Sequence, residues 1–141
     1  MPKKLSQRTK LVLCGALLAL VVAFGFGLDY LFTLRAYRRD IAAIQVRHVD
    51  LSAIADGEYY GDCDVDFVRA QVRVVVKDNQ IIELEMIEHY NDRGAAANEI
   101  PNRILQQQRI DVDAVSGATA SSKVIQEAVY NALTGERTIR K

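Results

Sequence analysis

Small and hydroxylated residues gather in the run Asp113–Ser122, which reads D-A-V-S-G-A-T-A-S-S. The residues after it repeat apolar side chains at helical spacing, so we expect a helix to begin within the run. A helix N-terminus exposes unpaired N–H groups and the positive end of the helix dipole, which together bind phosphate. Gly117 and Ala118 leave room for a bulky phosphorylated ligand, and Thr119 offers a hydroxyl to which a phosphate could be joined. The alternative is simple helix capping by a side-chain oxygen. The candidates for that role are Ser116, Thr119 and Ser121.

The segment Asp113–Thr119 fits the pattern D-x-x-[ST]-G-A-T and resembles the recognition sequence of the FMN-binding domain family. This family includes the flavin subunits of sodium-pumping NADH:quinone reductase and of Rnf-type ferredoxin:NAD oxidoreductase. Other features between about residues 56 and 133 also resemble the family in order and approximate spacing. They are Asp56–Tyr59, the Val72–Glu85 hairpin, His89 and Gln108.

The resemblance implies that Thr119 carries FMN as a phosphoester, attached by a separate Mg-dependent flavin transferase that uses FAD as donor. The other motif residues would be read by the transferase or line the phosphate. His89 stands at a predicted strand end, where it would contact the flavin; the alternative is a surface or structural histidine. Ala114 and Ala120–Ser121 depart from the residues common in the family, so noncovalent FMN at the same helix end is an alternative. The predicted cofactor-binding residues are Thr119 as the covalent attachment point, Asp113, Ser116, Gly117, Ala118, Ser121, Ser122 and His89.

The chemistry of such a protein belongs to the isoalloxazine ring, which passes one or two electrons while the protein supplies position and shielding. We therefore predict an electron carrier with no catalytic residue and no metal of its own. The chain has no G-x-G-x-x-G nicotinamide fingerprint, so its redox partners are expected to be proteins or membrane quinones. The rival interpretation is a membrane-anchored adaptor that has the fold but no flavin.

An aspartate series and a cysteine could suggest a metal site or a redox site, but neither fits the residue pattern that such a site requires. Asp62, Asp64 and Asp66 imitate the start of a calcium loop, but Phe67 stands where the loop needs Gly. Cys63 lies between two aspartates that disfavour its thiolate, so we expect a packed thiol.

Alternating and helical patterns predict an α+β domain, an antiparallel sheet with packed helices, over residues 56–135. Residues 68–76 and 82–86 alternate apolar and polar side chains, which predicts a hairpin. A three-residue loop, Asp78–Gln80, would pair Val76 with Ile82, Val74 with Leu84 and Arg73 with Glu85. A short helix is expected from Pro101 to Gln108, then a brief strand at Ile110 and Val112.

The segment Leu11–Leu28 contains no charged residue, and apolar residues continue to Leu34, which is enough to cross a bilayer as a helix. We predict a cytoplasmic N-terminus at 1–10, a single transmembrane helix at 11–34, a helical connector at 35–55 and a tail at 136–141. Basic residues flank both ends of the span with a slight excess before it, which favours an extracytoplasmic C-terminal domain in the cell membrane. A cleaved signal peptide is the alternative.

The 141-residue chain has a formal net charge of zero. Nucleic-acid binding needs a basic stripe that releases counterions from phosphates, so this class of partner is set aside. The length fits one compact domain with an appendage.

Overall fold

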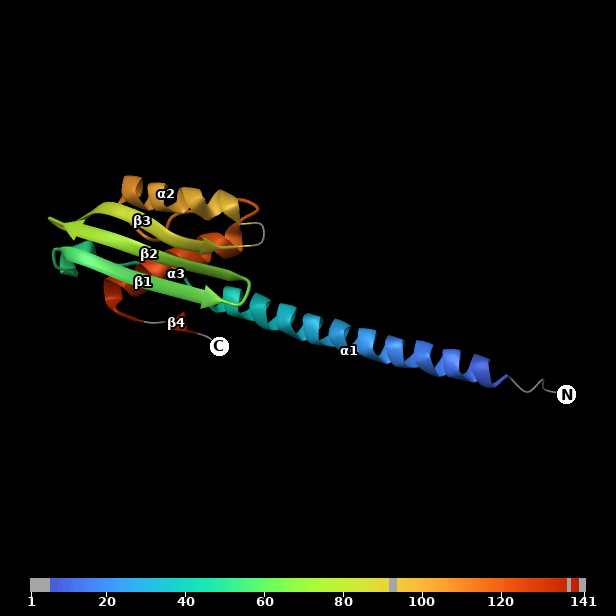
Figure 1. Ribbon diagram of the computed structural model, residues 1–141. Coiled ribbons are helices and arrows are strands. Elements are labelled where there is room, and N and C mark those ends of the chain that lie inside the picture. Colours follow the sequence, from blue (N-terminus) through green and yellow to red (C-terminus); the bar gives the residue numbers. More distant parts are fainter. Residues whose placement is uncertain (1–5, 92–93, 137, 140–141) are drawn as a thin grey trace. The chain divides into compact units, whose positions relative to one another are not determined.

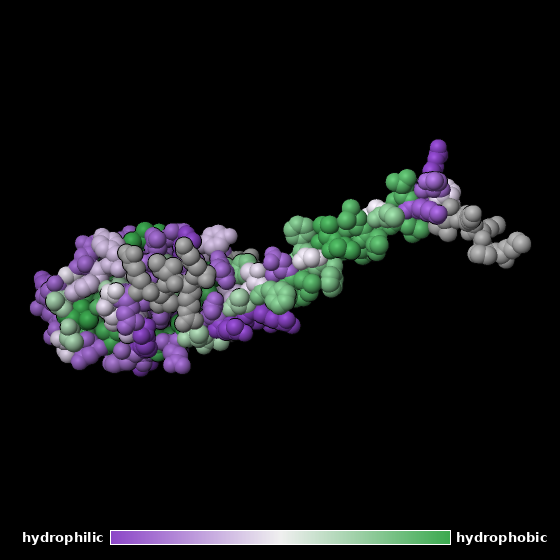
Figure 2. All heavy atoms as spheres, turned by 90° about the horizontal axis from the view of Figure 1, so that it is seen from below, coloured by the Kyte–Doolittle hydropathy of each residue, from purple (hydrophilic) through white to green (hydrophobic). Residues whose placement is uncertain are grey.

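The computed structural model describes residues 6–91, 94–136 and 138–139. It divides the chain into two compact units, Met1–Ala36 and Tyr37–Lys141. The first unit is formed by most of helix α1 (Gln7–Ala43), whose apolar side chains are exposed. Its stretch from Lys10 is long and apolar enough to cross a membrane, and Figure 2 shows the apolar surface along the helix. The sequence prediction of one apolar helix suited to a membrane anchor is therefore confirmed.

The second unit is an α+β domain, as predicted (Figure 1). Its sheet has the strand order β3-β2-β1-β4, in which β1, β2 and β3 are antiparallel and β4 runs parallel to β1. The strands are β1 (Gly57–Val65), β2 (Val68–Lys77), β3 (Gln80–Tyr90) and β4 (Thr138–Ile139). The helices are η1 (Leu51–Ala53), η2 (Ala95–Glu99), α2 (Ile100–Gln107) and α3 (Thr119–Thr134). β4 falls in the segment that we expected to be a tail.

Helix α3 packs directly on one face of β1 and β2 (Figure 1). The face of β2 that meets it carries only small and β-branched residues, all of them buried. Gly61 of β1 allows the closest approach, because a Cβ atom there would lie 2.7 Å from Cα of Ala132. Backbone therefore packs on backbone at this point, and the position of α3 on the sheet is fixed. The buried residues of β2 are Val68, Ala70, Val72, Val74 and Val76.

The turn between β2 and β3 differs from the predicted three-residue loop. Lys77 pairs with Gln80, so only Asp78 and Asn79 form the turn, with φ of 51° and 61°. Positive φ at both central residues is the requirement of a type I′ turn, whose twist matches that of the flanking strands. Aspartate and asparagine tolerate this conformation better than other residues except glycine.

A register shift next to the two-residue turn keeps apolar residues of β3 on the buried face of the sheet. Val76 pairs with Ile81 instead of the expected Ile82, and the register shifts between Val75 and Val76. As a result Ile81 is 2% exposed while Ile82 is 55% exposed. Beyond the irregularity the predicted register is confirmed, with Val74 opposite Leu84 and Arg73 opposite Glu85.

Two predicted regular segments are irregular in the structure. In the predicted connector, α1 ends at Ala43 and the short η1 follows at Leu51–Ala53, with Ile44 and Val49 between them buried as core residues. The expected strand at Ile110 and Val112 is absent from the described residues, and both side chains are buried. Val49, Ile110 and Val112 thus pack in the core outside helices and strands, whereas the N–H of Ile44 still donates to the carbonyl of Asp40 at 3.2 Å.

The last turn of α1 lies in the second unit and is held there by α3. The ammonium of Lys123 donates to the carbonyl oxygens of Ile41 and Ile44, at 3.4 and 3.3 Å. A cation at the C-terminal end of a helix satisfies carbonyls that have no partner within the helix.

Candidate functional site

The motif residues form a tight turn that leads into α3. The N–H of Ala118 donates to the carbonyl of Val115 at 3.0 Å, which closes the turn around Ser116 and Gly117. Gly117 has a φ of 80°, the value that the third residue of a type II turn requires and that glycine adopts without strain. A Cβ built on Gly117 would meet no atom within 4 Å, so the space above this residue is open.

Helix α3 begins at Thr119 with its first N–H groups uncapped. Within the described residues, no side chain makes a capping hydrogen bond at Ala118, the residue before the helix. The capping role considered for Ser116, Thr119 and Ser121 is therefore not seen. Thr119 is exposed to solvent at this end. An uncapped N-terminus beside an exposed hydroxyl is an arrangement suited to a phosphate group.

Ser122 stabilises the turn by two hydrogen bonds to its backbone. Its buried hydroxyl donates to the carbonyl of Ala118 at 2.9 Å and accepts from the N–H of Val115 at 3.0 Å. This side chain thus joins both ends of the turn. Because both hydrogen bonds join the hydroxyl to the backbone, Ser122 contributes to the site by fixing the position of the turn.

Ser121 is also buried, against Gly94 at the far side of the motif. A Cβ atom on Gly94 would lie 2.6 Å from Cβ of Ser121 and still closer to its hydroxyl oxygen. Only glycine fits at this position, which brings the segment before η2 directly against the first turn of α3.

Asp113 and Ser116 are exposed, as a recognition sequence read by another protein would be. The carbonyl of Asp113 accepts from the guanidinium of Arg103 at 3.1 Å, and Arg103 also pairs with Glu99 at 2.9 Å. Gln126, which is buried, donates to the carbonyl of Val112. Neither Arg103 nor Gln126 was identified from the sequence, since a side chain that fixes a distant carbonyl leaves no local pattern.

His89 lies on β3, and Asn91 and Asn98 lie beside its ring. Its Nδ1 is 2.7 Å from Oδ1 of Asn98 and 3.4 Å from Nδ2 of Asn91. Its Nε2 is buried and has no hydrogen-bond partner among the described residues. A buried polar atom without a partner costs free energy, on the order of 1–3 kcal/mol, so it marks a place where a ligand could contribute a bond.

A hollow of about 480 Å³ opens beside His89 on the inner side of β3. Its apolar lining comes from β3 and from the first turn of α2. The lining residues are Leu84, Met86, His89, Asn98 and Pro101.

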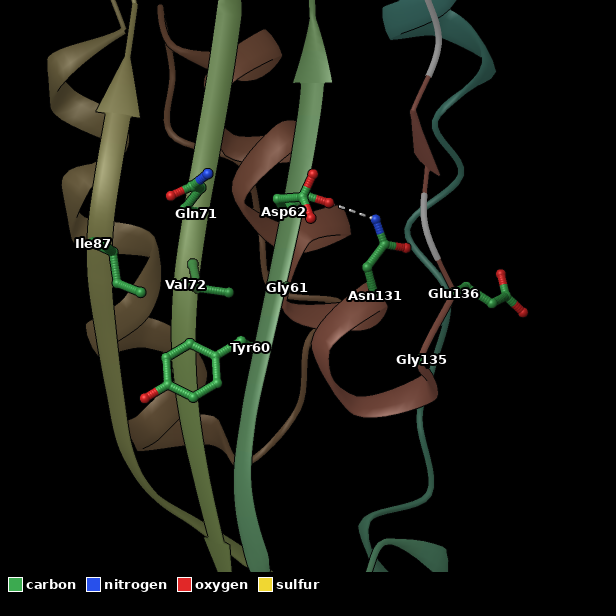
Figure 3. Close-up of a pocket in the computed structure, with 9 residues that line it drawn as sticks. All are labelled: Tyr60, Gly61, Asp62, Gln71, Val72, Ile87, Asn131, Gly135 and Glu136. Carbon is green, nitrogen blue, oxygen red and sulfur yellow. Dashed lines mark hydrogen bonds between the residues drawn. The ribbon is translucent and has the colours of Figure 1, made fainter.

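A second hollow, of about 420 Å³, lies near the other end of α3 (Figure 3). Asn131 and Gly135 line it, and Nδ2 of Asn131 donates to the carbonyl of Asp62 at 2.9 Å. None of the site residues predicted from the sequence lines this hollow. Tyr60, which stands on the outer face of the sheet opposite Arg73, is among the residues that line this hollow.

The outer face of the sheet carries several ion pairs. Arg73 pairs with Glu58, Glu83 and Glu85, and the bond to Glu85 is the main reason that the pKa of its guanidinium is raised. The hydroxyl of Tyr60 donates to Glu58 and lowers the pKa of that carboxyl. Among the described residues, no group of three or more His, Cys, Asp and Glu side chains could hold a metal ion.

Comparison with known proteins gives one result that covers this site. No curated protein matches the chain. Residues 68–134 match the FMN-binding domain family, from the start of β2 to the end of α3. The match includes the turn, Thr119, His89 and the hollow beside it. Residues 68–134 are therefore an FMN-binding domain, and FMN is the cofactor that this family implies.

Proposed function

We propose that this protein is a membrane-anchored electron carrier whose FMN is esterified through its phosphate to Oγ1 of Thr119. The observation that carries the proposal is the exposed hydroxyl of Thr119 at an uncapped helix N-terminus, inside a domain of the FMN-binding family. The site fits the group, because Gly117 leaves open space and His89 has an unpartnered Nε2.

Attachment requires a flavin transferase that supplies FAD. The hydroxyl oxygen of Thr119 forms a bond to the FMN-side phosphorus of the FAD pyrophosphate. The bond from that phosphorus to the bridging oxygen breaks, AMP leaves with that oxygen, and the hydroxyl proton passes to a base of the transferase. Exposed Asp113 and Ser116 are the residues that the transferase would read.

This chain's own residues then hold the phosphate and orient the flavin. The backbone N–H groups of Thr119, Ala120 and Ser121 have no acceptor within the helix and would donate to the phosphate oxygens. Ser122 and Gln126 keep the turn in place, and His89 contacts the flavin. The bound FMN supplies one- and two-electron transfer, and its partners are redox proteins or membrane quinones.

The single apolar helix and the FMN-binding domain together fit a membrane-anchored FMN-binding protein. We propose that the domain faces the extracytoplasmic side of the cell membrane, which the slight basic excess before the span supports. A C-terminal tag should then be cleaved by protease in right-side-out vesicles and protected in inverted ones. Protection in right-side-out vesicles alone would reverse the orientation.

Intact-mass measurement tests the attachment. The full chain is coexpressed with a flavin transferase, and wild type is compared with Thr119→Val, which keeps the shape and removes the hydroxyl. Thr134→Val, at the exposed C-terminal end of the same helix, is the matched control. Wild type and the control should carry one FMN adduct that survives denaturation, and Thr119→Val should carry none.

The other outcomes separate the alternatives. An identical adduct on Thr119→Val would place the attachment on another residue. Yellow protein that loses its colour on denaturation would show noncovalent FMN. Colourless wild type from a host with an active transferase would favour the adaptor without a flavin.

A further inference from the structure

The hollow beside His89 has the lining that a flat, partly apolar ring needs. Leu84 and Met86 stand on the inner face of β3, since their β2 partners belong to the buried row that faces α3. Pro101 closes the hollow from α2. A thioether, a leucine and a proline offer apolar contact, and methionine sulfur also makes favourable contacts with aromatic rings.

The polar side of the same hollow is formed by His89 and Asn98, which are joined at 2.7 Å through Nδ1 of the imidazole. Such a bond restrains the imidazole ring and leaves its second nitrogen for another partner. That nitrogen, Nε2, has none among the residues that the structure describes. An isoalloxazine has the matching character, with an apolar dimethylbenzene end and a pyrimidine end rich in donors and acceptors.

The hollow is connected to Thr119 through a short series of contacts. Ser121, in the first turn of α3, packs against Gly94. The N–H of Gly94 donates to Oδ1 of Asn91 at 2.8 Å, and Nδ2 of Asn91 lies 3.4 Å from Nδ1 of His89. These contacts link the first turn of α3, which begins at Thr119, to the polar side of the hollow.

The second hollow is a poor competitor, because of its place on α3. It lies at Asn131 and Gly135, whereas Thr119 is the first residue of this 16-residue helix. A helix of that length extends about 24 Å, which is longer than FMN from phosphate to ring. Carboxylates of Asp62 and Glu136 also line it.

We propose that the hollow formed by Leu84, Met86, His89, Asn98 and Pro101 receives the isoalloxazine ring of FMN. This rests on the proposed attachment of FMN at Thr119. It assigns the ring to the space between β3 and α2, with Met86 against the ring.

The sequence provides a sharp probe, because Met1 and Met86 are its only two methionines. The full chain in detergent is labelled with ¹³C at the methionine methyl groups, and its methyl spectrum is recorded with and without FMN loading. The loaded protein is wild type with the adduct verified by mass, and the unloaded protein is Thr119→Val. Met86 should shift on loading and show nuclear Overhauser contacts to flavin ring protons, whereas Met1 should not.

Ile87→Met adds a matched control probe on the same strand. Residue 87 is 52% exposed and follows Met86 directly, so its methyl should not respond to loading. A loaded protein in which the Met86 methyl neither shifts nor contacts the flavin overturns the ring site while leaving attachment intact. Wild type without an adduct would refute the attachment instead, and the mass measurement distinguishes the two failures. If Thr119→Val fails to fold, wild type made without transferase serves as the unloaded protein.

Discussion

Substitution of Gly61 by alanine should separate α3 from the sheet that positions Thr119. The added Cβ would lie 2.7 Å from Cα of Ala132 and nearer still to the carbonyl oxygen of Ala128. Both are backbone atoms of α3, so the helix itself must move. Overpacking of this kind costs typically 1–3 kcal/mol, and contact with backbone places it at about 3 kcal/mol.

Part of this cost is offset, because alanine reduces the conformational freedom of the unfolded chain by about 0.4–1 kcal/mol relative to glycine. The net loss of stability is then about 2 kcal/mol. For a domain of roughly 100 residues this lowers the unfolding midpoint by about 8–16 °C. The midpoint is measured on the full chain in detergent from the near-ultraviolet circular dichroism of its tyrosines.

Gly57→Ala, on the same strand, is the control for the unfolded-state effect. The nearest atoms to its new Cβ are in the ring of Tyr59 at 3.6 Å, which is ordinary van der Waals contact. This variant should unfold at or slightly above the wild-type midpoint. Equal midpoints for Gly57→Ala and Gly61→Ala would refute the close packing of α3 on β1.

Two other substitutions test the turn and the outer face. Ser122→Ala removes the partner of the part-buried Val115 N–H and of the Ala118 carbonyl, so unfolding should become easier by about 1–3 kcal/mol in urea titration. An unchanged midpoint would show that water replaces the hydroxyl. Tyr60→Phe removes the hydrogen bond that is the main cause of the lowered pKa of Glu58. The pKa of Glu58 should therefore rise toward its ordinary value in an NMR titration. A carboxyl with a lowered pKa stabilises the folded state above its ordinary pKa, and this stabilisation is lost as pH falls through the lowered value. The stability of the variant should therefore depend less on pH in that window. An unchanged Glu58 pKa would contradict the assignment.

Periodicity identified the strands of the hairpin and its central register but not its turn. The alternation of residues 68–76 is set by one buried face, so it survives in the structure unchanged. Of the two successive apolar residues Ile81 and Ile82, the alternation assigned Ile82 to the buried face, whereas the structure buries Ile81. Ile81 faces inward because the strands are joined by a type I′ turn and the register shifts beside it. Counting alternating residues does not reveal this combination.

Segments that pack without regular structure were assigned incorrectly for one physical reason. Ile110 and Val112 alternate like a strand, yet they are buried beside a carbonyl that Gln126 satisfies. A buried backbone group needs a hydrogen-bond partner, but that partner can be a distant side chain instead of a neighbouring strand. Local sequence shows the apolar spacing and not the side chain that replaces the ladder.

The site shows the same division between local and distant information. A run of small residues before a helical stripe predicted that a helix begins within Asp113–Ser122, and α3 begins there, at Thr119. The neighbourhood of His89 depends on Asn98 and on the packing of Gly94 against Ser121, which are tertiary contacts. Position in the chain therefore predicted the helix start that carries Thr119, and only the fold reveals the hollow beside His89.

The hydroxyls of the motif support the proposed phosphate site over simple helix capping. Capping needs a side-chain oxygen turned back to the first N–H groups of the helix. Ser122 has turned its oxygen toward the preceding turn, Ser121 is packed against Gly94, and Thr119 is exposed. Three hydroxyls thus stand at one helix end that no side chain among the described residues caps. A helix end with capping residues at hand and no cap leaves its N–H groups for an acceptor from outside the chain, and a phosphate joined to Thr119 is such an acceptor.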